Sequence, residues 1–336
     1  MLGADAMLTS LAVAGLAIVL LVAFALDYAI VFPRHHRGDE PTALSRLDAD
    51  LAGRLDAHLK AIASRPHNLF YPDALEASAL QIEARLGALG LVPARQVFKV
   101  DGHDVRNIEV TFEPQSPDEG PQLGTIVIGA HYDSPDDSPG ANDNGTGVAA
   151  LIELARLMTE MPPPRHRIRL VFFVNEEAPW CKTPDMGSWQ HALRLRRDGE
   201  RVVGMIALET LGYFSSRPGT QAFPTPFNWV YSDRGDFVAF VGLPRSRSFL
   251  RTALAAFRET GAFPSIGGVA PGFIPGIDLS DHWAYDQHGF PALMITDTAP
   301  FRNPYYHQTN DTPDTVDTAS LARIVVGLAG MVRKIG

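Results

Sequence analysis

The stretch "TIVIGAHYDSPDDSPGANDNGTGVAALIELARLM", residues 125–158, decides the fold. Its first six residues are typical of a short apolar strand, and residues 148–158 are typical of a helix. Between them lies a glycine-rich loop, residues 129–147, that contains one histidine and four aspartates. Like charges repel, so such a loop is costly unless something positive lies among the carboxylates. The loop is therefore either a solvated acidic turn or a metal site.

The rest of the chain repeats the alternation of strand and helix. The pattern predicts a hairpin over 94–100 and 106–112, and further strands over 168–174, 202–208 and 290–296. It predicts helices over 44–62, 75–89, 187–196, 247–259 and 318–332, and an otherwise irregular segment over 212–270. We therefore expect a three-layer α/β/α fold, whose mixed sheet is mostly parallel and covered on both faces. Residues 42–336 form one catalytic domain in this interpretation.

Composition excludes several classes of protein. The 336 residues are 46% hydrophobic and 20% charged, which is enough to build a large core. The net charge is −9 and no block of Lys and Arg is sustained, so nucleic acid is not an expected partner. Cys181 is the only cysteine, so neither an internal disulfide nor a cysteine-based zinc cluster is possible.

The N-terminus favours a membrane anchor. Residues 7–26 carry no charge and match the length of about 20 residues that a spanning helix needs. A cleaved signal peptide is the rival interpretation, but no Lys or Arg precedes the run. We expect a single-pass membrane protein in which residues 33–41 are a polar linker. Arg34 and Arg37 follow the run, and this charge bias places the main domain in the cytoplasm.

Polar side chains follow each predicted strand of the alternating region. His131, Asp133 and Asp143 follow the first strand, Glu176 and Glu177 the second, Glu209 the third and His307 the last. Ligands of open α/β sheets bind beyond the carboxyl ends of the strands, so these side chains should converge on one edge. Any one of them alone is more often a surface turn or a packed residue. Their shared position, and the repulsion among the carboxylates, predict a bound cation.

The residue types narrow the choice of metal. Imidazole and carboxylate without thiolate suit a catalytic zinc site, with manganese or cobalt as possible substitutes. The carboxylates outnumber what one tetrahedral zinc can use. We therefore expect two ions that share a carboxylate, an arrangement found in aminopeptidases.

The motifs "HYDS", "GANDNGTG", "NEE", "ALETLGY" and "YYHQTNDTPDT" resemble, in order and spacing, those of metallopeptidase family twenty-eight, which includes di-zinc aminopeptidases. The resemblance runs from about Pro41 to the C-terminus. It implies a peptide substrate and a zinc exopeptidase fold. Members that resemble this chain mostly work outside the cytoplasm, so the resemblance favours an extracytoplasmic domain, against the charge bias beside residues 7–26.

The resemblance also implies a role for each residue of the site. Glu176 resembles the general base, and Asp133 the carboxylate that fixes the tautomer of His131. Glu209 stands where better-known aminopeptidases have aspartate. The implied metal ligands are Asp143 as the bridge, His131 and Glu209 for one ion, and Glu177 and His307 for the other.

Other functions stay open at this point. A mono-zinc glutaminyl cyclase shares the fold, but its pattern has tryptophan before the last histidine, where this chain has Tyr306. A carboxypeptidase would need a cation for the substrate carboxylate, and Arg302 is the candidate. A membrane-anchored binding protein with a dead peptidase fold should have lost ligands, whereas this chain has all five. We expect Asp281 and His282 to organise a loop beside the site.

Overall fold

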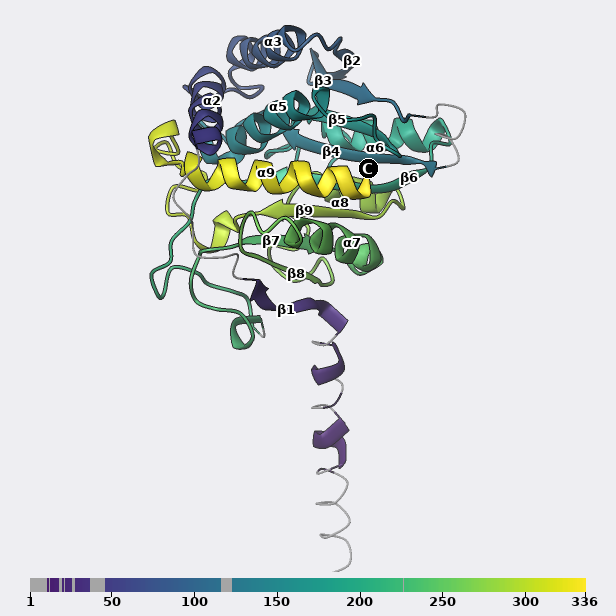
Figure 1. The fold of residues 1–336 in the computed structure, drawn as a ribbon, viewed down its shortest axis with the longest axis vertical. Coiled ribbons are helices and arrows are strands. Elements are labelled where there is room, and N and C mark those ends of the chain that lie inside the picture. The colour runs from purple at the N-terminus through teal and green to yellow at the C-terminus, as the bar shows by residue number, and fades with distance from the viewer. Residues whose placement is uncertain are drawn as a thin grey trace, which may run out of the picture.

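A mixed sheet forms the centre of the molecule (Figure 1). The computed structural model describes residues 11, 13–17, 20, 22–25, 28–36, 46–115, 123–225 and 227–336. Within these residues the sheet has nine strands in the order β1-β8-β7-β9-β6-β4-β5-β3-β2. The strands are β1 (Ile30–His36), β2 (Ala94–Val100), β3 (His103–Phe112), β4 (Thr125–His131), β5 (Arg167–Phe173), β6 (Val202–Glu209), β7 (Val238–Gly242), β8 (Ser265–Val269) and β9 (Ala292–Thr296).

Four neighbouring strands at the middle of the sheet are parallel, and most of the pairs outside them are antiparallel. β5, β4, β6 and β9 pair in parallel, as do β7 and β8, whereas β2–β3, β3–β5, β7–β9 and β1–β8 are antiparallel. Every residue of β4 is buried, as expected for a parallel strand covered on both faces. The predicted three-layer fold with a mixed sheet is confirmed. The expectation that the sheet is mostly parallel is wrong, because among the described strands four neighbouring pairs are parallel and four are antiparallel.

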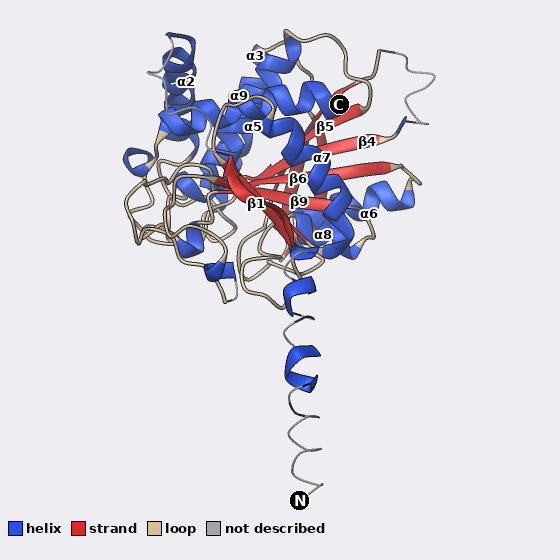
Figure 2. Cartoon of the chain, turned by 60° about the horizontal axis from the view of Figure 1, so that its bottom comes forward, coloured by secondary structure: helices blue, strands red, loops and turns tan. Residues whose placement is uncertain are grey.

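Helices cover both faces of the sheet (Figure 2). On one side, α9 packs against α2, α5 and α7, and α3 packs against α2 and α5. On the other side, α6 packs against α8. The bounds are α2 (Arg46–Ile62), α3 (Pro72–Ala88), α5 (Thr146–Thr159), α6 (Gly187–Arg197), α7 (Arg247–Arg258), α8 (His282–Gln287) and α9 (Thr318–Ile335).

The buried apolar side chains form separate clusters on the two faces. The largest cluster joins the α2–α3–α5–α7–α9 layer to the sheet, and a second lies between the sheet and helices α6 and α8. A third, small cluster contains Phe237, Ala239 and Ile266, against which Phe223 and Tyr231 pack. In that third region the sheet is covered by loop residues rather than by a helix.

The strands predicted within 94–112, 125–130, 168–174, 202–208 and 290–296 are all present, with bounds shifted by a few residues. The segment 212–270 is more regular than expected, because it contains β7 and β8 as well as α7. Of the expected linker 33–41, residues 33–36 belong to β1, and residues 37–41 lie outside the described residues.

The expectation of a single-pass membrane protein is wrong. Several positions of the run 7–26, among them 7–10 and 18–19, lie outside the described residues. The described residues of that run, 11, 13–17, 20 and 22–25, are helical. Among all described residues, no helix is both long and apolar enough to cross a membrane.

Candidate metal centre

The polar residues predicted from the strand ends meet at one edge of the sheet. His131 ends β4 and Glu209 ends β6, while Glu176 and Glu177 lie in the turn that follows β5. Asp143 lies in the loop between β4 and α5. All five are buried, because the neighbouring parallel strands and their loops enclose this edge. His307, which follows β9 at a distance, is exposed and completes the cluster.

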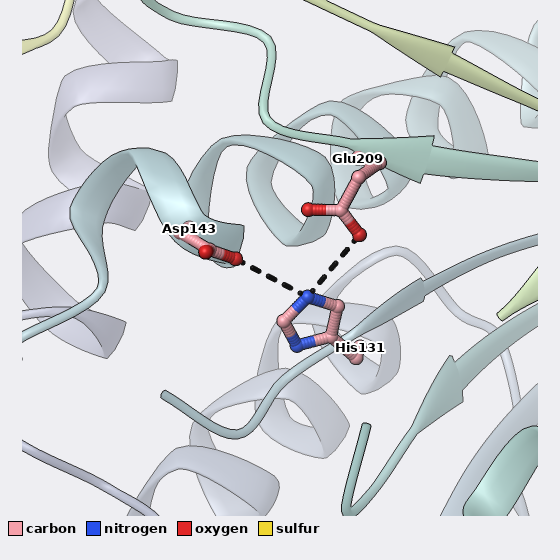
Figure 3. Close-up of side chains that lie close together, drawn as sticks. All are labelled: His131, Asp143 and Glu209. Carbon is pink, nitrogen blue, oxygen red and sulfur yellow. Dashed lines mark ion pairs between the residues drawn. The ribbon is translucent and has the colours of Figure 1, made fainter. Parts of the chain in front are cut away.

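The first group of potential ligands consists of His131, Asp143 and Glu209 (Figure 3). The Nε2 atom of His131 lies 3.4 Å from Oδ1 of Asp143 and 3.3 Å from Oε2 of Glu209. Ligand atoms bound at about 2.0–2.2 Å to one tetrahedral ion are roughly 3.3–3.5 Å apart. The two distances from Nε2 of His131 therefore match those expected between ligand atoms of a single zinc ion.

The second group consists of Asp143, Glu177 and His307. Here the other carboxylate oxygen of Asp143, Oδ2, lies 3.1 Å from Nε2 of His307. The Oε2 atom of Glu177 lies 3.7 Å from the same histidine nitrogen. The two oxygens of Asp143 thus face two different histidines.

His131, Glu176 and Glu177 form a third combination of potential ligands. In this combination Oε2 of Glu176 lies 3.9 Å from Nε2 of His131, farther than the oxygens of Asp143 and Glu209. The thiol of Cys181 approaches Oε1 of Glu176 at 3.8 Å. Glu176 is therefore close to the cluster but set back from its shortest contacts.

The loop that carries Asp143 is held by the side chains on either side of it. Asn144 donates to the carbonyl of Leu208 and accepts from the amide of Thr210, which fixes the loop to the end of β6. The carboxylate of Asp311 accepts from the backbone amides of Asn142 and Asp143. Asp311 lies in the motif "YYHQTNDTPDT", but its contacts with residues about 170 positions away in the chain become visible only in the fold.

Glycine is required at Gly140, where the loop turns into this bend. Its φ is +67°, a left-handed conformation that L side chains rarely adopt, and an added Cβ would lie 2.4 Å from the carbonyl oxygen of Asp143. Left-handed backbone also occurs at three non-glycine residues near the cluster, namely Asn175, Thr210 and His307. Such conformations cost about 1–3 kcal/mol each and gather at functional sites.

Asp133 holds the segment that carries both glutamates. Its two carboxylate oxygens accept from the backbone amides of Glu176 and Glu177, each at 3.1 Å. The Nδ1 atom of His131 hydrogen bonds to the backbone carbonyl of Asp133 at 3.1 Å, while the nearer carboxylate oxygen lies 3.6 Å away. Asp133 therefore orients His131 largely through its backbone, and its carboxylate positions the turn after β5.

The buried carboxylates of the cluster would be stabilised by a bound positive charge. Burial raises the pKa of Glu177 well above its ordinary value, and the neighbouring Asp143 and Glu176 raise it further. Burial also raises the pKa of Glu209, although His131 opposes the shift. For Asp143 burial would raise the pKa, but the neighbouring imidazoles of His131 and His307 lower it below the ordinary range.

Two buried atoms of the cluster, Nε2 of His131 and Oδ1 of Asp143, have no hydrogen-bond partner in the described structure. Unpartnered buried polar atoms are costly, and here they face each other across 3.4 Å with Glu209 beside them. The donor set of imidazoles and carboxylates is the one that zinc accepts. The residues present therefore fit a bound metal.

Other side chains contact the cluster or lie beside it, and only some of them were predicted from the sequence. Ser280 donates to Oε2 of Glu209 at 2.8 Å, and the ring of Tyr306 stacks on His307 with centroids 3.9 Å apart. His282 donates from Nε2 to the carbonyl of Ile277 at 2.8 Å, which matches the expected loop-organising role. Burial raises the pKa of the adjacent Asp281 to about 7.

The side chain of Arg302 hydrogen bonds to other residues of the fold. Its Nε donates to Gln221 at 2.6 Å and its Nη1 to the carbonyl of Phe237 at 2.9 Å. The guanidinium lies 4.4 Å from the centre of the Phe237 ring. These contacts direct Arg302 toward the loop before β7, so they give no support to a contact with a substrate carboxylate.

Residues 107–332 match the family described as Peptidase family M28. The uncharacterized protein YfbL of Escherichia coli is 40% identical over 265 residues, which cover 76% of this chain and 79% of YfbL. Further relatives, 22–27% identical, are named as probable aminopeptidases, and the chain spans 42–54% of their length.

Solved structures with a similar fold include an aminopeptidase and a cyclase. The LapA aminopeptidase of Legionella pneumophila has a TM-score of 0.65 at 15% identity and covers 88% of this chain and 77% of its own. The glutaminyl cyclase of Fimbriiglobus ruber has a TM-score of 0.63 at 19% identity and covers 88% of this chain and 97% of its own. At these identities the likeness concerns the fold alone.

Proposed function

The chain belongs to peptidase family M28, and from that premise we propose that it is a zinc-dependent aminopeptidase that holds two ions and removes N-terminal residues from peptides. One observation carries the proposal. The two carboxylate oxygens of Asp143 face two different histidines, at 3.4 Å and 3.1 Å. A carboxylate shared in this way is the arrangement expected of a bridge between two ions.

The five residues divide naturally between the two positions. His131 and Glu209 would hold one ion, Glu177 and His307 the other, and Asp143 both. When bound, the ions acidify a water molecule and polarise the scissile carbonyl. Ser280 and Asp133 would keep the surrounding side chains and backbone in place, through their bonds to Glu209 and to the amides of Glu176 and Glu177.

Glu176 is the general base in this proposal. Its carboxylate is buried next to the cluster. Burial raises its pKa well above the ordinary value, and the neighbouring Cys181 raises it further. A base with a raised pKa can accept the proton of the attacking water near neutral pH and then deliver it to the leaving amine. Side chains of successive residues diverge, which suits one glutamate that binds metal and another that moves a proton.

The surroundings favour an aminopeptidase over a carboxypeptidase. A carboxypeptidase needs a cation for the substrate carboxylate, and Arg302 is bonded to Gln221 and to backbone carbonyls instead. A free N-terminal ammonium suits a site rich in buried carboxylates. Glutaminyl cyclases share the fold, but Tyr306 stands where their pattern has tryptophan. We assign the activity to residues 42–336 as one catalytic domain.

A panel of amino-acid p-nitroanilides, with N-acetylated counterparts as controls, tests the proposed function. The purified protein with zinc should cleave free amino-acid p-nitroanilides and leave the acetylated ones intact. Formation of pyroglutamate from an N-terminal glutaminyl peptide, without any cleavage of p-nitroanilides, would overturn the proposal in favour of a cyclase.

A further inference from the structure

An apolar cavity opens beside the candidate metal centre. It has a volume of about 850 Å³, its open mouth included, and Glu209, Thr210 and Tyr306 lie among its lining residues. Tyr306 stacks on His307, so the cavity begins next to both groups of potential ligands. Of the described residues that line it, Glu209 is the one that carries a charge.

The floor of the cavity is the sheet itself. The strand register places Glu209 of β6 beside Thr296 of β9, Thr296 beside Ala239 of β7, and Ala239 beside Ile266 of β8. Paired residues of neighbouring strands share a face of the sheet, and all four line the cavity. At about 4.8 Å per strand, Ile266 lies roughly 14 Å across the sheet from Glu209.

Small side chains leave this space open. The four paired residues form a row across the floor of the cavity. Ala239 lies in this row between Thr296 and Ile266, and is itself buried. Helices α6 and α8 cover the same face only nearer the centre of the sheet, where the second apolar cluster lies. Over β7 and β8 the cover is a loop that carries Phe223, Phe227 and Tyr231.

Resting on the proposed function, we propose that this cavity receives the side chain of the N-terminal residue, and that it selects large aromatic side chains. The cavity extends farther from Glu209 than an aliphatic side chain can reach, and its cover is aromatic. Aromatic rings bury the most surface and gain further from edge and offset contacts with other rings. Acidic and basic side chains find no opposite charge among the described lining residues beyond Glu209.

Ala239 is the specificity-determining residue in this proposal. A larger side chain there projects into the middle of the row and shortens the cavity, while the candidate metal centre lies two strands away. The matched control is Ala255→Leu, the same change on helix α7, whose position is partly exposed and does not line the cavity.

The test compares kcat/KM for alanine, leucine, phenylalanine, tryptophan, lysine and glutamate p-nitroanilides. We expect phenylalanine to exceed alanine by at least about 30-fold, from the additional apolar surface buried, and lysine and glutamate to be the poorest. Ala239→Val should reduce the ratio of phenylalanine to alanine, and Ala239→Leu should bring it below about threefold, with alanine cleavage within about threefold of wild type. Ala255→Leu should leave the ratio unchanged.

The outcomes separate this inference from the function on which it rests. If no substrate is cleaved, the proposed function fails. If alanine is cleaved but phenylalanine is not preferred, or if Ala239→Leu keeps alanine cleavage and an unchanged ratio, the aromatic selectivity is overturned and the aminopeptidase stands. Retained alanine cleavage in Ala239→Leu shows that this variant is folded, and Ala239→Val supplies the milder change if it is not.

Discussion

Replacing each of the adjacent glutamates with glutamine separates proton transfer from metal binding. Glu177 lies in the group that contains Asp143 and His307, with Oε2 at 3.7 Å from the histidine, whereas Glu176 stands 3.9 Å from His131 and touches Cys181. Glu176→Gln should therefore retain its zinc and lose about 10²–10⁴ in kcat, or roughly 3–5 kcal/mol of barrier stabilisation. Glu177→Gln should lose zinc, because a neutral amide is a poor zinc ligand.

The assay is kcat with a cleavable p-nitroanilide, together with zinc content by elemental analysis on the same samples. Glu160→Gln, an exposed glutamate beyond the end of α5, is the matched control and should change neither quantity. Loss of zinc from Glu176→Gln, with zinc retained in Glu177→Gln, would mean that the two roles are exchanged. Full kcat in a zinc-loaded Glu176→Gln would refute the mechanism.

Three further predictions concern stability and its coupling to the site. Asp133→Ala should weaken zinc binding and lower Tm more than Asp133→Asn does. The reason is that the carboxylate accepts hydrogen bonds from two backbone amides, at about 1.5–3 kcal/mol each. Zinc titration and thermal unfolding measure the two effects, and equal effects of the two variants would count against this role. Although burial opposes ionisation, His58, Arg156 and Arg54 lower the pKa of Glu153 to about 2. Its stabilisation is therefore present above the unfolded pKa and lost as pH falls toward 2, so the difference in free energy of unfolding between wild type and Glu153→Gln should shrink between pH 5 and pH 2. Burial raises the pKa of Glu177 and of Glu209, so their ionised forms are unfavourable without a metal. Removal of zinc by a chelator should therefore lower Tm, and the metal-free protein should lose stability as pH rises above the ordinary glutamate range. A Tm independent of pH and of chelator would contradict this prediction.

The site was predictable because parallel strands deliver their carboxyl ends to one edge. Once the strands ending at His131 and Glu209 are recognised, the convergence of their polar residues follows from topology. The positions of Asp311 and Ser280 could not be predicted in this way. Each acts through a contact with a residue distant in the chain, and only the tertiary fold brings the two together.

The short strand β8 could not be predicted from its sequence for a different reason. β8, "SIGGV", contains two glycines in five residues, and glycine is depleted in strands. Burial against α7 and pairing with neighbouring strands override this weak local preference. The uncharged run 7–26 misled for the opposite reason. Its sequence is strongly apolar, yet among the described residues no helix is both long and apolar enough to span a membrane.

The zinc content of the purified protein tests the central claim most directly. If Asp143 bridges two ions, elemental analysis should approach two zinc equivalents per chain. Asp143→Asn should lower the occupancy of both positions together, because its two oxygens face His131 and His307 separately. One equivalent of zinc in a fully active wild-type enzyme, or loss of a single ion in Asp143→Asn, would contradict the account.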